Sequence, residues 1–250
     1  APLETQFELF NNKNGLSQGF VSCIFQDKTG FLWFATKDGL NKFDGYHITV
    51  YRYNPEEKYS LTDNSISFLT EDEQGNFWVG TRNKGLFLFD RFHENFYPIQ
   101  RDASDNLVNN PITSIICRQQ KMLVADYHDI CIYDISGISS ATQYDVIPRQ
   151  IKKVFSFNAL QNPGQQKSDN RLLPKVAWLA DNSIWKASTD SIFICKGNSN
   201  FDHWTVERKP MQAFDLGPQR TFQVFHRPNS PQLIFVGSSS LNVYDINTQQ

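Results

Sequence analysis

One segment of this chain occurs twice, and the repeat constrains the fold more than any other feature. The first copy covers 21–45 and the second covers 66–90. The two copies share an aspartate, a glycine and a tryptophan at the same spacing, namely Asp27, Gly30 and Trp33 in the first and Asp72, Gly75 and Trp78 in the second. A period near 45 residues is the sequence signature of a repeat architecture, so we expect each copy to be one structural unit.

Each copy has the pattern of four short β-strands. In the first copy the expected strands are 21–26, 31–36, 40–43 and 47–53, with turns between them. The Asp27 carboxylate can accept backbone N–H groups within the first turn, and Gly30 supplies a positive φ without steric cost. Four antiparallel strands cannot bury both faces alone, whereas sheets stacked around an axis can. The pattern therefore predicts an all-β fold, a β-propeller built of four-stranded antiparallel blades.

We expect one propeller domain over 1–250 with about five blades. A third blade is less regular, and Trp185 marks a fourth. The expected blades are 16–53, 61–100, 112–147, 175–208 and 221–245. The fifth ends without a fourth strand, and 7–10 is a spare strand that could complete it and close the ring. Five blades in a closed ring and five blades of a seven-blade ring both fit the sequence.

Composition excludes several classes of protein. The formal net charge is −2, and no basic stripe of the kind that binds nucleic acid is visible. No apolar run approaches the roughly 18 to 20 residues that cross a bilayer. The four cysteines lack the spacing of metal ligands and lie in predicted strands, so we interpret them as buried thiols. They are Cys23, Cys117, Cys131 and Cys195.

The motif as a whole resembles a known repeat. Gly15-Leu16-Ser17-Gln18 is followed by Asp27, Gly30, Trp33, Thr36 and then 38–45, DGLNKFDG, and the second copy repeats this order. This pattern resembles the two-component regulator propeller repeat, strongly over 15–97 and weakly over 112–134. The resemblance implies the periplasmic sensor region of a hybrid two-component histidine kinase, typical of bacteria that detect and degrade complex glycans. Nothing in the chain resembles a kinase, a phosphoacceptor or a DNA-binding domain.

No catalytic set is evident, and we predict that this chain is not an enzyme and has no metal or cofactor. Asp27 and Asp72 could be mistaken for a carboxylate pair, but their equivalent positions in successive turns favour a structural role. The tryptophans are expected to pack between blades rather than to stack on sugars. They are Trp33, Trp78 and Trp185.

A binding surface is expected where the loops between second and third strands meet at one end of the blades. These loops carry Lys37, Arg82, Lys84, Tyr127 and His128. Cationic and aromatic side chains of this kind could hold an anionic or polyhydroxylated sugar through charge-assisted hydrogen bonds and stacking. The competing interpretation is that these are ordinary solvated loops.

The leading hypothesis is therefore an extracytoplasmic, periplasmic sensor fragment that recognises a glycan-derived oligosaccharide and controls polysaccharide utilisation. It predicts a homodimer in the full receptor, no nucleic-acid partner, and contact with the membrane only through a downstream segment. One alternative is a propeller-fold polysaccharide lyase or glycoside hydrolase. Another is a scaffold for protein partners.

Overall fold

The computed structural model describes residues 9–99, 111–126, 129–138, 151–158, 176–187, 191–210, 214, 221–226, 230–237 and 241–248. It divides the chain into two compact units. Unit 1 comprises Ala1–Pro111 with Ser139–Pro148, and unit 2 comprises Ile112–Ile138 with Arg149–Gln250. The expectation of a single propeller domain stays a prediction.

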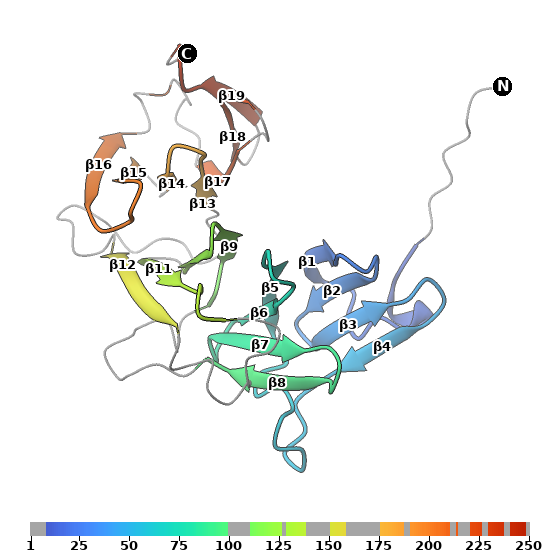
Figure 1. Cartoon of the computed structure of the whole chain (residues 1–250). Coiled ribbons are helices and arrows are strands. Elements are labelled where there is room, and N and C mark those ends of the chain that lie inside the picture. The colour runs from blue at the N-terminus through green and yellow to red at the C-terminus, as the bar shows by residue number, and fades with distance from the viewer. Residues whose placement is uncertain are drawn as a thin grey trace. The chain divides into compact units, whose positions relative to one another are not determined.

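Unit 1 contains two four-stranded antiparallel sheets, here called blades one and two, in which neighbouring strands follow chain order. Figure 1 shows the strands of blade one side by side, β1 to β4. A short 3-10 helix, η1 (Asn12–Asn14), precedes them. The strands of blade one are β1 (Val21–Gln26), β2 (Leu32–Thr36), β3 (Gly39–Phe43) and β4 (Ile48–Tyr51). Those of blade two are β5 (Ile66–Glu71), β6 (Phe77–Thr81), β7 (Leu86–Asp90) and β8 (Asn95–Pro98).

The core of unit 1 lies between the facing sides of these two sheets. Alternate residues of each strand point to one face, so a strand that packs on a neighbouring sheet offers every second side chain to it. Trp33 of β2 is 1% exposed and contacts Phe77 and Phe89 of blade two, with ring centroids 4.8 and 5.6 Å away. The aromatic excess of the sequence is therefore used to fill the space between stacked sheets.

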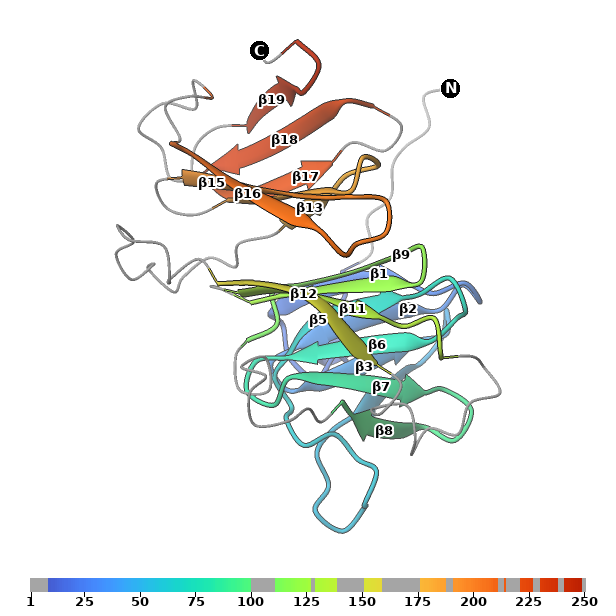
Figure 2. The same cartoon turned by 60° about the vertical axis from the view of Figure 1, so that its left-hand side comes forward.

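Unit 2 contains three antiparallel sheets, blades three to five (Figure 2). Blade three has β9 (Ser114–Arg118), β10 (Lys121–Ala125), β11 (Asp129–Asp134) and β12 (Lys152–Asn158). Blade four has β13 (Val176–Trp178), β14 (Ser183–Ala187), β15 (Ser191–Gly197) and β16 (Trp204–Pro210). Blade five has β17 (Thr221–His226), β18 (Gln232–Gly237) and β19 (Leu241–Asp245).

The prediction of an all-β fold with four-stranded antiparallel blades is confirmed for four of the five sheets in the described part of the chain. Blade three needs a correction, because its fourth strand is β12, which pairs with β11 and lies beyond the predicted boundary at 147. The sequence pattern marks 154–157 as an extra or displaced strand, which β12 confirms, but it could not assign this strand to blade three, since 135–151 separates it from its partner. The first hairpin of this blade turns at Gln119 and Gln120, whose φ angles are 48° and 58°, as in a two-residue hairpin loop.

Blade five has three strands among the described residues. The predicted completing strand at 7–10 falls partly outside them, because residues 7 and 8 are not described. Leu9 and Phe10 are described and are not in a strand. The ring of Phe10 lies 6.0 Å from that of Phe34 and 4.9 Å from that of Phe43, both in blade one. Closure of the ring through this segment therefore stays a prediction.

Candidate functional site

The repeated aspartate is bound within its own turn and to the repeated tryptophan. The Asp27 carboxylate accepts from the backbone N–H groups of Thr29 (2.9 Å) and Phe31 (3.1 Å), and from the Trp33 indole Nε1 (2.9 Å). Asp72 repeats this arrangement, with Trp78 Nε1 at 3.0 Å. Each carboxylate is thus occupied by donors of its own hairpin, and the pair does not form a site for acid–base chemistry.

A second set of contacts joins the two turns. The Arg91 guanidinium lies 3.1 Å from Asp27 Oδ2 and 2.9 Å from Glu71 Oε1, and it donates to the Gly75 carbonyl at 2.8 Å. Burial raises the pKa of the Asp27 carboxyl, but hydrogen bonds from Thr29, Trp33 and Phe31 and the charge of Arg91 outweigh it. The pKa therefore lies below its usual value. This network fastens blade one to blade two.

The loops after β2 and after β6 lie at the same end of unit 1. Gly39 donates its N–H to the Asn64 carbonyl (2.7 Å), and Arg82 donates its N–H to the Ser65 carbonyl (2.9 Å). Asn64 and Ser65 are neighbours in the link between the blades, so both loops are held by one short segment. Lys37, Arg82 and Lys84, which the sequence placed in a binding surface, are carried by these two loops. We call this end of unit 1 the loop surface.

Two threonines of the repeat shape the loops in the same way. Thr36 Oγ1 donates to the Gly39 carbonyl (2.9 Å), and Thr81 Oγ1 donates to the Gly85 carbonyl (3.0 Å). Gly39 has a φ of 118°, and a Cβ there would lie 2.5 Å from the Tyr51 carbonyl oxygen. A glycine is therefore required at this position.

The loop surface also contains groups that sequence reasoning did not select. Lys37 Nζ lies 4.8 Å from the ring centre of Phe20, which is 53% exposed. Arg52 Nη2 pairs with Asp38 Oδ2 at 3.0 Å. Arg52 and Phe20 belong to neither predicted loop, so no loop-based reading of the sequence could have included them. The resulting surface offers cations, carboxylates and an exposed ring, a combination that can bind a hydroxylated or anionic molecule.

A further acceptor group at the loop surface is Asp63. It accepts from the Asn83 backbone N–H at 2.8 Å and from the Asn83 side-chain amide at 3.2 Å. These bonds hold the Arg82–Lys84 loop against the link between the blades. Arg82 Nε is buried and has no hydrogen-bond partner among the described residues.

Tyr127 and His128 lie outside the described residues, so their place relative to the other predicted ligand-binding residues is a prediction. The residues that flank them are described. Lys186 Nζ, on β14 of blade four, donates to the backbone carbonyls of Asp126 (3.0 Å) and Asp129 (3.2 Å). Sequence reasoning missed this lysine, because a lone Lys in an apolar strand carries no motif.

Lys186 is a buried cation, with 1% of its surface exposed. Burial lowers its pKa to about 8, against the opposing effects of Asp126, Asp129, Cys195 and Cys131. Burial also raises the pKa of the Cys195 thiol to about 12. The buried ammonium therefore joins blades three and four within unit 2, and the neighbouring thiol stays protonated.

The third repeated tryptophan also packs between sheets. Trp185 of β14 is 5% exposed, and its ring lies 6.0 Å from that of Phe214 and 6.1 Å from that of Tyr244. Its indole Nε1 donates to Ser183 Oγ at 3.2 Å instead of to an aspartate. Blades four and five therefore share the packing arrangement of blades one and two with a different polar partner.

None of the four cysteines, all of which are described, forms a disulfide; Cys131 and Cys195 are buried and the other two are partly buried. Within the described ranges, no group of three or more His, Cys, Asp or Glu side chains is placed to hold a metal ion. No helix among the residues described has the length and apolar character needed to cross a lipid bilayer.

Comparison with known sequences gives two findings. The model of the family described as Two component regulator propeller matches residues 15–38 and 60–83. Histidine kinase P4 from Formosa agariphila is 52% identical to this chain over 56 residues, which cover 22% of this chain and 4% of that protein. The chain thus spans a small part of the length of this relative.

Comparison with solved structures gives the fold. The extracellular domain of a protein described as a hybrid two-component system from B. thetaiotaomicron is similar with a TM-score of 0.54 and 19% identity, over 96% of this chain and 36% of that one. PorZ, a surface component of the type-IX secretion system of Porphyromonas gingivalis, has a TM-score of 0.61 and 13% identity, over 92% and 33%. The β-propeller domain of Cps50 from Myceliophteria thermophila has a TM-score of 0.55 and 15% identity, over 90% and 82%.

At these identities the structural likenesses show the fold alone, a β-propeller. In blades one and two, the matched residues cover the end of the segment that precedes the blade, its first two strands and the loop after the second strand. These are the segments that place the turn aspartate, the interblade tryptophan and the loop surface. Residues 15–38 and 60–83 of this chain therefore each carry a two-component regulator propeller repeat.

Proposed function

We propose that this chain belongs to the periplasmic sensor region of a hybrid two-component histidine kinase, and that its loop surface contacts a glycan-derived oligosaccharide. The family repeats support the receptor class, as does the local likeness to a protein named as a histidine kinase. In this proposal kinase activity and the membrane anchor reside in other parts of the receptor.

The observation that carries the ligand proposal is the shared anchoring of the two loops. Because Asn64 and Ser65 hold both loops, cationic side chains from two blades lie at one end of unit 1. Lys37 and Lys84 can donate to sugar hydroxyl or carboxylate oxygens, and Asp38 can accept from hydroxyl groups. The exposed ring of Phe20 offers an apolar face to the C–H side of a pyranose. Each of these contacts contributes little binding free energy alone, so an oligosaccharide that reaches several of them should bind more tightly than a monosaccharide.

Signalling would require that the ligand bind one arrangement of a receptor dimer more tightly than another, since equal binding shifts no equilibrium. The homodimer is part of this proposal. In this proposal the oligosaccharide that binds comes from the polysaccharide whose utilisation the receptor controls. Binding of the oligosaccharide is therefore the first property to measure.

The test is titration calorimetry of the 250-residue chain against a panel of neutral and anionic oligosaccharides. We expect at least one to bind, and the variants Lys37→Ala and Lys84→Ala to weaken that binding by about threefold to tenfold each, as loss of a charge-assisted hydrogen bond predicts. Lys13→Ala is the matched control, an exposed lysine of η1 that lies outside both loops. No binding by any member of the panel, or equal effects of Lys37→Ala and the control, would show that the loop surface is not the site.

A further inference from the structure

The loop surface carries more positive charge than its own carboxylates neutralise. Its charged side chains are four cations and two carboxylates, namely Lys37, Arg52, Arg82 and Lys84 with Asp38 and Asp63. Arg52 pairs with Asp38 at 3.0 Å. Lys37, Arg82 and Lys84 form no ion pair with a carboxylate in the described part of the chain. Because the whole chain has a formal net charge of −2, this positive excess is a local feature.

The two carboxylates of the loop surface are already occupied by donors. Arg52 Nη2 donates to Asp38 Oδ2 at 3.0 Å, and Arg52 Nε donates to the carbonyl of the same residue at 3.1 Å. Asp63 accepts from the N–H groups of Ser65 (3.0 Å) and Asn83 (2.8 Å). Both carboxylates therefore hold the loops in place, and neither neutralises the other three cations.

The backbone that carries these cations is fixed by the repeat threonines. The Asp38 N–H donates to Thr36 Oγ1 at 3.0 Å, and the Lys84 N–H donates to Thr81 Oγ1 at 3.0 Å. Lys37 lies between two residues of the first of these turns. A ligand therefore needs to order little of the loop backbone, which lowers the entropic cost of binding. Like charges held at one end of the blades also create a positive potential that attracts anions.

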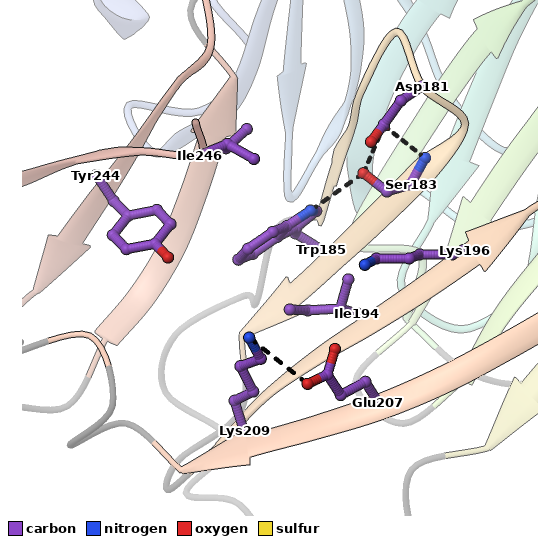
Figure 3. Close-up of a pocket in the computed structure, with 9 residues that line it drawn as sticks. All are labelled: Asp181, Ser183, Trp185, Ile194, Lys196, Glu207, Lys209, Tyr244 and Ile246. Carbon is purple, nitrogen blue, oxygen red and sulfur yellow. Dashed lines mark hydrogen bonds and ion pairs between the residues drawn. The ribbon is translucent and has the colours of Figure 1, made fainter. Parts of the chain in front are cut away.

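The pocket lined by blades four and five shows the opposite arrangement of charge. It has a volume of about 180 Å³, and its charged lining consists of two lysines and two carboxylates. Lys209 lies 3.5 Å from Glu207, and Figure 3 shows this pair together with Asp181 and Lys196. The charges of this pocket balance, so it gives no preference for an anion. The positive excess thus distinguishes the loop surface from this pocket.

An anionic sugar would complement the loop surface better than a neutral one. Hydrogen bonds between an ammonium group and an anionic oxygen are about twice as strong as bonds between neutral groups. Attraction between charges also extends over about 8–10 Å at moderate salt, so cations that do not touch the ligand still contribute. A neutral oligosaccharide gains neither effect. Carboxylate and sulfate groups share this chemistry, and both occur on sugar rings.

We propose that the loop surface selects anionic oligosaccharides, which carry carboxylate or sulfate groups, over neutral oligosaccharides of the same length. This inference rests on the proposed function, because it specifies the ligand class of the same surface. Lys37 and Lys84, which are exposed, contact the anionic groups, and the half-buried Arg82 adds to the positive potential. The uncharged parts of the sugar meet the ring of Phe20.

The test compares oligosaccharides that differ only in charge. The first pair is tetragalacturonic acid and its methyl ester, and the second is a sulfated galactan tetrasaccharide and its desulfated form. In titration calorimetry with the 250-residue chain, the acidic member of at least one pair should bind at least about tenfold more tightly than its neutral counterpart. Raising the salt from about 50 to about 300 mM should weaken that binding by about threefold or more. The pair that responds distinguishes a carboxylate ligand from a sulfate ligand.

Variants of the full chain assign the selectivity to the loop surface. Lys84→Glu should weaken binding of the acidic oligosaccharide at least about tenfold, whereas Lys84→Arg, which keeps the charge, should retain most of it. Lys13→Glu is the matched control, the same charge change on η1, and should leave binding within about twofold. Asp38→Asn should tighten binding by about twofold, because it removes a carboxylate and leaves the Arg52 guanidinium unpaired. This expected gain of affinity keeps the test decisive even if Lys84→Glu fails to fold.

The possible failures separate this inference from the proposed function. Equal binding of the acidic and neutral members, or binding that does not respond to salt, would overturn the charge selectivity and leave the oligosaccharide site in place. Equal effects of Lys84→Glu and Lys13→Glu would overturn it as well. No binding by any of the four oligosaccharides or by the wider panel at about 1 mM would overturn both the selectivity and the proposed function.

Discussion

The link between blades one and two through Arg91 can be tested by replacing this residue with methionine. The substitution keeps most of the aliphatic length of the side chain and removes the guanidinium. It leaves the carboxylates of Asp27 and Glu71, whose side chains are 0% and 3% exposed, without their shared cation. Removing one partner of a buried ion pair costs far more than removing an exposed one, because the remaining charge stays desolvated.

The magnitude follows from the contacts that remain. A fully buried pair that loses one partner costs about 3–5 kcal/mol. Arg91 is 26% exposed, and Asp27 keeps the donors of its own turn, so we expect a smaller loss, about 2–3 kcal/mol of unfolding free energy for unit 1. For a unit of about 100 residues this corresponds to a fall of about 10–15 °C in melting temperature.

The assay is hydrogen exchange followed by mass spectrometry in increasing denaturant, which reports the strands of unit 1 and unit 2 separately. The matched control is Arg52→Met, which removes an exposed ion pair with Asp38, the two side chains being 47% and 45% exposed. We expect it to cost less than about 0.5 kcal/mol. If the Arg91 and Arg52 variants lost equal stability, or if Arg91→Met changed nothing, the network would not fasten the two blades.

The same variant should change the response to acid. The folded-state pKa of Asp27 is lowered, so its contribution to stability is present above the pKa of the unfolded chain and is lost as pH falls. Arg91 is one cause of that lowering. The stability that unit 1 loses between about pH 5 and pH 2 should therefore be smaller in Arg91→Met than in the original chain, and an equal loss would contradict this account.

Three further predictions concern single residues. Gly39→Ala should cost about 2 kcal/mol or more of unfolding free energy, since its Cβ would meet the Tyr51 carbonyl. Gly30→Ala, where φ is 95° and the space around the residue is open, should cost about 1 kcal/mol. Equal losses for the two variants in denaturant unfolding would contradict the close approach at Gly39. Trp33→Phe should cost about 1–2 kcal/mol in the same measurement, because the turn aspartate loses the indole donor, and no loss would mean that this bond contributes nothing. Lys186 has a lowered pKa in the folded chain, so the unfolded chain binds its proton more tightly, and the stability of unit 2 should rise from about pH 8 upward. Lys186→Met should abolish that rise. A pH profile of stability that is the same in the variant would refute the role of buried Lys186 in it.

The sequence determined the local geometry of the repeat. The bonds of Asp27 to Thr29, Phe31 and Trp33 span two to six residues, so the spacing of side chains alone is enough to define the turn. The strand pattern of blades one and two followed for the same reason, because alternation along a strand reflects which face is buried. The likeness of the two copies also placed Lys37 and Arg82 in equivalent loops.

Other features depended on residues far apart in the chain, and no periodicity could reveal them. The fourth strand of blade three is separated from its partner by a long connection, so its assignment required the observed pairing with β11. Arg52 and Phe20 approach the predicted loops from neighbouring segments. Lys186 reaches the carbonyls of Asp126 and Asp129 across about 60 residues of sequence, and only the packing of two sheets brings it there.

The sequence by itself thus determined that blades one and two are four-stranded antiparallel sheets, because the turn and strand signals are local and repeat. Only the tertiary structure decided how the sheets are fastened and which side chains of separate segments lie together. Arg91 joins the turns of blades one and two, and Lys186 joins blades three and four, and both contacts result from side chains of separate blades being packed face to face. Such contacts depend on which surfaces meet, and no local sequence pattern specifies that.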